Sequence, residues 1–236
     1  HWCTSNRRQH HLPTAQFPIG NEATQLAHCV RDLGIFVDAD LTMRTHISKT
    51  VSSCFAAMRQ IRSIRRSVTQ PVLLSLVVAL VLSRLDYGSA TLAGLPQNQL
   101  DRLQLVLNAA ARLVFSARRR DHVTPLLMDL HWLRVPERIN FRLAVLVYRC
   151  LHGLGPTYLA RDLRKVSDVS LRSGLRSATS ETLVVPRTRR TTIGDRAFVV
   201  AAARVWNNLP LSVTGAQSLI TFRRALKHNC FTNLLV

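Results

Sequence analysis

The chain has 236 residues, of which 47% are hydrophobic, and this length and composition favour one or two packed domains and exclude a disordered tail. The formal net charge is +19, from 32 Lys and Arg residues against 13 Asp and Glu residues. Because so large an excess of positive charge repels itself until a polyanion neutralises it, we expect nucleic acid as the partner, ahead of an anionic membrane surface.

The positive charge is carried almost entirely by arginine, since Lys49, Lys165 and Lys227 are the only lysines. A guanidinium group binds phosphate through two parallel hydrogen bonds and stacks on bases. GC-rich coding sequence also produces arginine without selection for function. The bias therefore indicates a polyanion without identifying it.

Cysteine use and hydropathy indicate an intracellular protein. The five cysteines lie far apart without a C-x-x-C pair, which is typical of reduced thiols. The longest apolar run, residues 71–82, is too short to span a bilayer, and no signal peptide is recognisable. We expect a cytoplasmic or nuclear location, no secretion, no membrane partner and no small-molecule substrate. The start lacks an initiator methionine, as expected of a fragment.

Residues 1–40 predict a small β element, the first of three regions. Trp2–Ser5, Phe17–Ile19 and Leu33–Val37 are short extended segments between polar and proline-containing turns. The rest of the chain has a helical period, so the predicted fold class is mainly α, with this β element at its N-terminal side.

A three-helix bundle is predicted for residues 41–116, because three helical segments follow each other with short connections. In the first, over 42–66, the residues Arg59, Arg62 and Arg66 form a basic ridge beside an apolar stripe. A ridge of this kind is either a solvated face or a phosphate contact, and the net charge favours phosphate. Lys49, on the same helix, is a further predicted nucleic-acid contact.

The second and third helices are predicted at 72–85 and 98–115. The second is apolar nearly all round, so we expect it at the centre of the packing. Arg118, Arg119 and Arg120 are expected to close the third. Cations are favourable at a helix C-terminus, and the same side chains can bind phosphate, so both roles stay open.

A second helical block is predicted for residues 117–236. Short and long helices are expected at 125–131 and 136–151, and a last one at about 218–231. Residues 164–192 predict a long basic loop with one strand at Thr182–Val185.

Three arginines of this loop, Arg187, Arg189 and Arg190, are also predicted to contact nucleic acid. After them, Thr192 and Asp195 resemble a capping box that opens another helix.

No pattern of catalytic residues is recognisable. Asp38 and Asp40 are the most tempting pair, since two-metal phosphoryl transfer needs converging carboxylates. They lie where a strand gives way to a helix, and Asp is a preferred turn and N-cap residue, so we predict a turn. The pair His10–His11 lacks partners at ligand spacing. We therefore predict no catalytic residue and no metal site.

Ordered strings of residues run through almost the whole chain: Arg31–Asp38, Ser83–Gly88, Leu103–Ala110, His122–Pro125, Asp129–Leu133, Pro136–Ile139, Val185–Arg189, Gly194–Phe198 and Trp206–Pro210. In this order they resemble the C-terminal part of the reverse transcriptase of LINE-type, non-LTR retrotransposons, in the jockey-like and chicken-repeat-like branch. The resemblance is specific, because so many strings in one order are difficult to match by chance.

The resemblance implies a role for each region. Leu33 and Gly34 would belong to a primer-grip turn at the edge of the polymerase palm. The helices at 42–66, 72–87 and 98–115 would form the thumb, which holds the template–primer duplex. The remaining residues would form the region beyond the thumb.

The resemblance also implies that the catalytic aspartates, their Mg site, the fingers and the endonuclease would precede His1. We therefore expect a non-catalytic fragment that binds no cofactor. Its partners would be RNA, an RNA–DNA hybrid or DNA, and the missing palm and fingers of the same polyprotein. The alternative is a helical protein-interaction module, or a decayed copy, derived from the same element.

Overall fold

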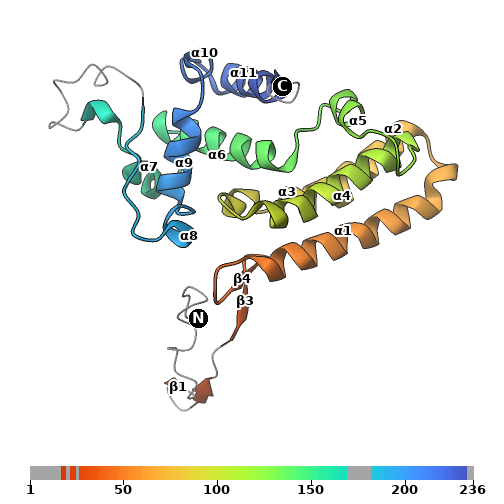
Figure 1. Cartoon of the computed structure of the whole chain (residues 1–236), viewed down its shortest axis with the longest axis horizontal. Coiled ribbons are helices and arrows are strands. Elements are labelled where there is room, and N and C mark those ends of the chain that lie inside the picture. Colours follow the sequence, from red (N-terminus) through yellow and green to blue (C-terminus); the bar gives the residue numbers. More distant parts are fainter. Residues whose placement is uncertain (1–16, 20–21, 25–26, 169–181, 233–236) are drawn as a thin grey trace. The chain divides into compact units, whose positions relative to one another are not determined.

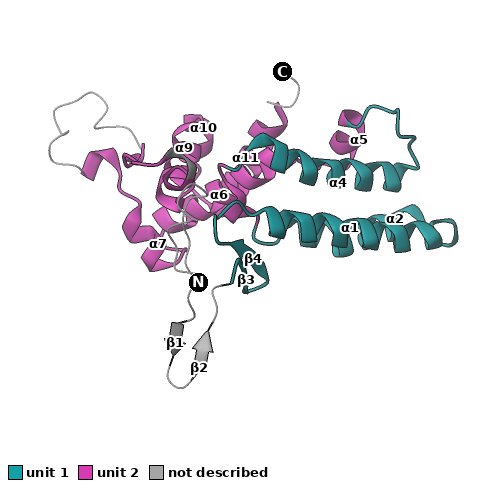
Figure 2. Cartoon of the chain, turned by 60° about the horizontal axis from the view of Figure 1, so that its bottom comes forward, with its two compact units in different colours: residues 1–88, 95–123 teal, residues 89–94, 124–236 magenta. Residues whose placement is uncertain are grey.

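The computed structural model describes residues 17–19, 22–24, 27–168 and 182–232 (Figure 1). It is mainly helical, with small antiparallel strand pairs before the helices, which confirms the predicted fold class. The chain divides into two compact units (Figure 2). Unit 1 comprises residues 1–88 and 95–123, and unit 2 comprises residues 89–94 and 124–236.

Two short hairpins precede the helices. Strand β1 (Phe17–Ile19) pairs with β2 (Glu22–Thr24), and β3 (Cys29–Asp32) pairs with β4 (Ile35–Asp38). The predicted strand at Phe17–Ile19 is therefore confirmed. The predicted strand Trp2–Ser5 and the pair His10–His11 lie outside the described residues.

The predicted strand Leu33–Val37 is wrong at its first two residues, because Leu33 and Gly34 form the turn between β3 and β4. Both have positive φ, 44° and 86°. A two-residue turn with positive φ at both positions matches the right-handed twist of the strands it joins, and glycine adopts that conformation at low cost.

Three helical segments form the body of unit 1. Helix α1 (Arg44–Ile64) ends in a 3₁₀ turn, Arg65–Ser67. A continuous second segment consists of α2 (Gln70–Val77), a π-helical turn (Val78–Leu82) and α3 (Ser83–Asp86). The third is α4, Gln97–Phe115. The predicted helices at 42–66, 72–85 and 98–115 agree with these bounds to within two residues.

The core of unit 1 lies between α1 and α4, with the second segment against both. Fully buried side chains come from each segment, among them Ile47, Cys54, Val77, Val81, Val106 and Leu107. Burying a large aliphatic side chain contributes about 1.5–3 kcal/mol, so this core holds the three segments together. Figures 1 and 2 show that α1 and α4 run in the same direction, so their C-terminal ends lie together.

Helix α4 ends before the three arginines that were expected to close it. Ser116 adopts a left-handed conformation with φ 57°, and the backbone N–H of Ala117 donates to the carbonyl of Arg112 at 3.0 Å. This is a common way for a helix to satisfy its last carbonyls. Arg118, Arg119 and Arg120 therefore lie beyond the last residue of the helix instead of closing it.

Unit 2 is built around α6 (Val135–Leu151), against which α9 (Phe198–Asn207) and α11 (Leu219–Thr232) pack. Phe222 of α11 stacks on Tyr148 of α6, with ring centroids 4.4 Å apart, and lies 5.9 Å from the ring of Trp206. These three aromatic side chains are buried and form the centre of the unit.

Shorter elements complete unit 2: a 3₁₀ turn (Ser89–Leu92), α5 (Thr124–Asp129), α7 (Thr157–Asp162), a second 3₁₀ turn (Val166–Asp168), α8 (Thr191–Gly194) and α10 (Leu211–Thr214). Among the helices that the structure describes, none combines the length and the apolar character needed to cross a bilayer.

Two local predictions for unit 2 are wrong. The strand expected at Thr182–Val185 is reduced to a single bridge between Leu183 and Lys165, because the side-chain amide of Asn207 occupies both backbone groups of Leu183 at 2.8 Å. The helix expected to open at Thr192 and Asp195 begins only at Phe198, and Asp195 instead binds Thr188 and Arg204.

Candidate nucleic-acid interface

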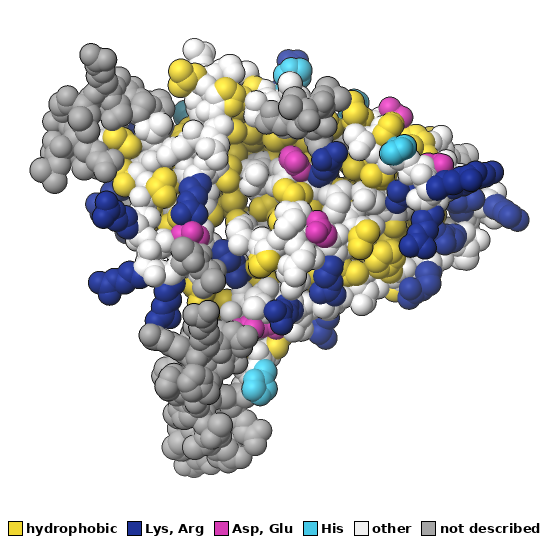
Figure 3. Space-filling model, in the orientation of Figure 1, with side chains coloured by type: hydrophobic (Ala, Val, Ile, Leu, Met, Phe, Trp, Pro, Cys, Tyr) yellow, Lys and Arg dark blue, Asp and Glu magenta, His cyan; other side chains and the backbone are white. Residues whose placement is uncertain are grey.

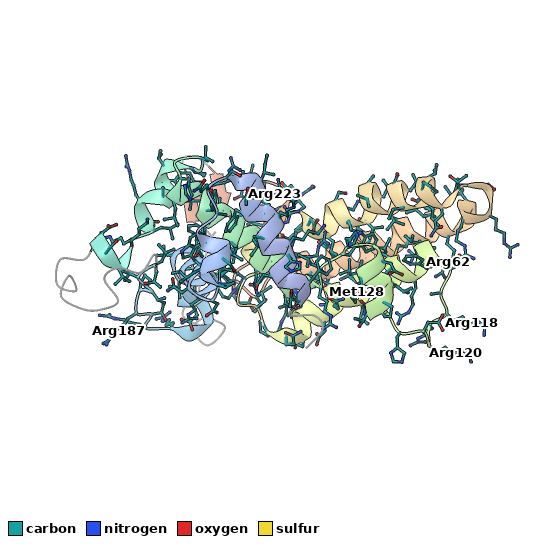
Figure 4. All side chains as sticks on the ribbon, turned by 90° about the horizontal axis from the view of Figure 1, so that it is seen from above. Arg62, Arg118, Arg120, Met128, Arg187 and Arg223 are labelled. Carbon is teal, nitrogen blue, oxygen red and sulfur yellow. The ribbon has the colours of Figure 1, made fainter. Side chains whose placement is uncertain are left out.

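The ten basic side chains predicted to bind nucleic acid are all exposed, but they lie in three separate places. Arg59, Arg62 and Arg66, at the end of α1, lie beside the three arginines that follow α4; Figure 4 shows Arg62 close to Arg118 and Arg120. Lys49 lies further back along α1. Arg187, Arg189 and Arg190 belong to unit 2.

We call the first group, with its neighbours in the same turns, the arginine end of unit 1. Its members lie in the last two turns of α1 or α4 or just after them: Arg59, Arg62, Arg65, Arg66, Arg112, Arg118, Arg119 and Arg120. Figure 3 shows basic side chains gathered over this end of the unit. Because α1 and α4 are parallel, two basic segments about fifty residues apart in sequence form one surface.

Arg118, Arg119 and Arg120 are presented by a tight turn. The backbone N–H of Asp121 donates to the carbonyl of Arg118 at 3.1 Å, and the Asp121 carboxylate accepts the Arg118 backbone N–H at 2.6 Å. Arg112 anchors this turn to α4, since its Nη2 donates to the Asp121 carbonyl at 3.1 Å. A carboxylate accepting a backbone N–H makes a strong, charge-assisted bond, so the turn is held in one conformation.

The arginine end contains almost no acidic charge. Asp121 is the only acidic residue in the stretches 59–70 and 108–121, against eight arginines. Within the part of the chain that the structure describes, no carboxylate forms an ion pair with these guanidinium groups. The positive potential is therefore not cancelled internally and is available to a polyanion.

Helix dipoles explain part of this arrangement. Arg62 and Arg112 lie in the last turns of their helices, where a cation is stabilised by about 0.3–1 kcal/mol. The dipole does not account for the three arginines of the turn, which lie outside α4. The N-terminal end of α2 also lacks the negative charge that a helix dipole favours there. Its first turn has no acidic residue, and its N-cap, Thr69, makes no side-chain hydrogen bond.

Lys49 is not part of the arginine end. Its Nζ lies 4.6 Å from the centroid of the Phe36 ring, and the Arg31 guanidinium lies 5.6 Å from the same ring. The contact from Lys49 attaches the β3–β4 hairpin to α1, whereas the contact from Arg31 lies within the hairpin. Lys49 precedes Arg59 by ten residues, or about 15 Å along the helix axis.

The turn at Leu33 and Gly34 is tied to the end of α3. The Tyr87 hydroxyl donates to the Leu33 carbonyl, and a Cβ at Gly34 would lie 3.1 Å from the Tyr87 ring. Glycine is therefore required here both for its φ and for this close approach. The Leu33 side chain is 84% exposed. A role in gripping a primer stays a prediction from the resemblance.

Asp38 and Asp40 form the predicted turn. Asp40 accepts the backbone N–H and the hydroxyl of Thr42 at 3.0 and 2.7 Å, and Asp38 accepts the backbone N–H of Thr45 at 3.1 Å. Both carboxylates thus satisfy groups at the start of α1. Next to them His46 is buried, and burial lowers the pKa of its imidazole, while Asp38 partly opposes the shift.

In unit 2, the segment carrying Arg187, Arg189 and Arg190 is held at two points. Asn207 binds Leu183, and the Thr188 hydroxyl donates to the Asp195 carboxylate at 2.6 Å. That carboxylate also pairs with Arg204 at 3.2 Å, and both bonds hold its pKa below the usual range. Asp195 therefore clamps this segment to α9 instead of capping a helix.

Sequence reasoning missed two members of the arginine end and the residue that shapes it. Arg65 could have been predicted from the sequence, since it adjoins Arg66 in the same basic run. Arg112 and Asp121 gave no signal, because their importance depends on a turn that forms only after α4 ends at Phe115.

Comparisons with protein-family models, with curated proteins and with solved structures find no match to this chain. The resemblance to LINE-type reverse transcriptases is therefore a prediction that its ordered motifs alone support.

Proposed function

We propose that this chain is a non-catalytic, nucleic-acid-binding fragment of a LINE-type reverse transcriptase. Unit 1 would be the thumb, and the arginine end would contact the backbone phosphates of the template–primer duplex. The observation that carries the proposal is the meeting of eight arginines from two helix ends beside a single carboxylate that is already bonded to backbone.

The chemistry of these groups favours phosphates over bases. Guanidinium groups match phosphate geometry and displace condensed counterions, which gives sequence-independent binding that weakens steeply with salt. Single-strand binders usually add a series of stacked aromatic side chains. The stretches 59–70 and 108–121 contain one aromatic residue, Phe115, so a duplex held by its backbone suits this surface better.

A thumb of this kind needs no catalytic group of its own. It would hold the duplex in position, while carboxylates and metal ions of the preceding palm perform nucleotide transfer. The chain would therefore bind template and primer without extending the primer, and it would depend on the palm and fingers of the same polyprotein for activity.

The test measures binding of the full chain to a 20-base-pair RNA–DNA hybrid over a range of salt concentrations. Changing Arg59, Arg62 and Arg66 together to Ala should lower the slope of log affinity against log salt by about 3, since each lost phosphate contact removes about 1. The affinity should fall at least about tenfold at moderate salt.

A control variant removes the same charge elsewhere. Arg44, Arg161 and Arg164 are exposed and lie outside the arginine end, so their joint change to Ala tests the effect of net charge alone. Equal losses in the two variants, or a folded wild-type chain that does not bind the hybrid, would refute the proposal.

A protein-interaction module is the second candidate, and one observation favours it. The segment α2–α3 exposes large apolar side chains, with Val72 at 47%, Val78 at 43% and Leu80 at 37%. Large apolar side chains left in water are typical of a surface that binds another protein. Association through these side chains should persist or strengthen at high salt, whereas phosphate binding weakens.

A further inference from the structure

A second basic surface lies on α11 in unit 2, and the packing of the helix determines which residues form it. Phe222, Leu226 and Cys230 are buried, and Phe222 stacks on Tyr148 of α6. These positions are four residues apart and occupy one side of the helix. The opposite side and its flanks therefore carry the exposed cations Arg223, Arg224 and Lys227, together with His228.

Acidic residues are absent from this part of the sequence. Asp195 is the last Asp or Glu of the chain, so neither α11 nor any later residue carries a carboxylate. Within the described part of unit 2, Arg223 and Arg224 form no ion pair, and Lys227 contacts only the ring of Phe231, with its Nζ 5.9 Å from the centroid. Burial raises the pKa of the Cys230 thiol to about 11, and the negative charge of Glu137 of α6 adds to this shift. Glu137 therefore lies near the buried side of α11 and not near its exposed cations.

Helix stability does not explain these cations. A positive side chain is favourable in the last turn of a helix and unfavourable in the first. Arg223 and Arg224 are the fifth and sixth residues of α11, and its last turn contains no basic residue. They therefore lie nearer the end at which the dipole disfavours a positive charge. Arg223 and Arg224 are therefore either solvated or in contact with an external anion, and the net charge of +19 favours the anion.

We propose that α11 is a second nucleic-acid-binding surface, which contacts backbone phosphates through Arg223, Arg224 and Lys227. Arg223, labelled in Figure 4, belongs to unit 2, whereas Arg62 and Arg118 belong to unit 1. The inference rests on the charges of α11 alone and does not require the arginine end of unit 1 to bind.

Nucleic acid suits this surface better than an anionic membrane. A helix that lies on a membrane inserts a broad apolar face between the lipid headgroups. The apolar face of α11 is already buried in unit 2, and Ile220, 83% exposed, is the large aliphatic side chain that its outer side leaves in water. Binding to the phosphates of a duplex requires only exposed cations, which the outer side of α11 carries.

The experiment uses the full chain and the same 20-base-pair RNA–DNA hybrid. A variant with Arg223, Arg224 and Lys227 changed to Gln should lower the salt slope by about 3 and weaken binding at least about tenfold. A matched variant with Arg223 and Arg224 changed to Lys retains the charge and should keep the slope of the wild type. Far-UV circular dichroism and thermal unfolding establish that both variants fold.

If the Gln variant does not fold, crosslinking of the wild-type chain tests the proposal instead. Ultraviolet crosslinking of wild-type chain to the hybrid, followed by mass spectrometry, should yield a crosslinked peptide from residues 218–232. Crosslinks confined to unit 1 would overturn the inference, as would a folded Gln variant with the wild-type slope.

Running this variant beside the variant of Arg59, Arg62 and Arg66 separates the two proposals. Loss confined to the unit 1 variant overturns the α11 surface and supports the proposed function. Loss confined to the α11 variant does the reverse. Vesicles of anionic lipid form a third arm: if the Gln variant loses vesicle binding but binds the hybrid normally, the surface recognises membranes and the inference is wrong.

Discussion

Units 1 and 2 both contain many arginines, but they use them differently. In unit 1 eight arginines collect at one end, where none of the described carboxylates pairs with them, while Arg84 and Arg102 donate to Ser53 and Ser48 elsewhere in the unit. In unit 2 several are bonded within the protein, since Arg204 pairs with Asp195, Arg134 reaches the Thr124 hydroxyl and Arg149 donates to the Leu154 carbonyl. A count of arginines therefore overstates a binding surface, because an arginine that is bonded within the protein, such as Arg204 or Arg149, is less available to an anion.

The largest expected effect concerns stability, and it tests whether the two units fold separately. Phe222 is fully buried between Tyr148 and Trp206, so Phe222→Ala should destabilise unit 2 by about 3–5 kcal/mol. Leu107, fully buried in unit 1, is the matched site, and Leu107→Ala should cost about 2–5 kcal/mol. Differential scanning calorimetry should show each change lowering one transition and leaving the other in place.

If either substitution moves both transitions together, the units fold as one, and the comparison between them loses its meaning. Phe222→Leu serves as a control, because it keeps most of the buried volume and should lower the transition of unit 2 much less.

A smaller effect concerns how unit 1 presents its arginines. Asp121→Ala removes the only carboxylate of the arginine end and on charge alone should strengthen binding. It also removes the acceptor that holds the Arg118 backbone N–H, so we expect affinity for the hybrid to fall several-fold. Asp121→Asn keeps an acceptor without the charge and should bind at least as tightly as the wild type. Tighter binding by both variants would mean that the turn does not need Asp121.

The smallest effect is a pH dependence expected of unit 1. Burial lowers the pKa of His46, so the unfolded chain binds this proton more tightly than the folded chain. The contribution of His46 to stability is therefore complete above about pH 6.5 and is lost as the pH falls toward the folded pKa. Urea unfolding should show a lower free energy of unfolding at pH 5 than at pH 7.5.

His46→Gln removes the titrating group and should make this part of the pH dependence disappear. His228→Gln is the matched control for replacing a histidine, since His228 is exposed in unit 2. A loss of stability that persists in His46→Gln would assign the pH dependence to other groups.

Helix positions were predictable because they depend on neighbours in sequence. The apolar stripes of α1, α4 and α6 recur at helical spacing, and their bounds differ from prediction by only one or two residues. The errors occur where a distant group replaces a local one. Asn207 takes the place of a neighbouring strand at Leu183, and Thr188 with Arg204 takes the place of a helix end at Asp195.

The sequence by itself determined the helical class, the helix bounds and the excess of positive charge, since each follows from local periodicity or from composition. Only the tertiary structure decided that the end of α1 and the turn after α4 form one surface, and that Lys49 lies against Phe36 instead. The direction in which helices pack depends on contacts between residues distant in the chain, such as those that bury Ile47, Val81 and Val106. No spacing along the sequence encodes which of two helix ends will meet.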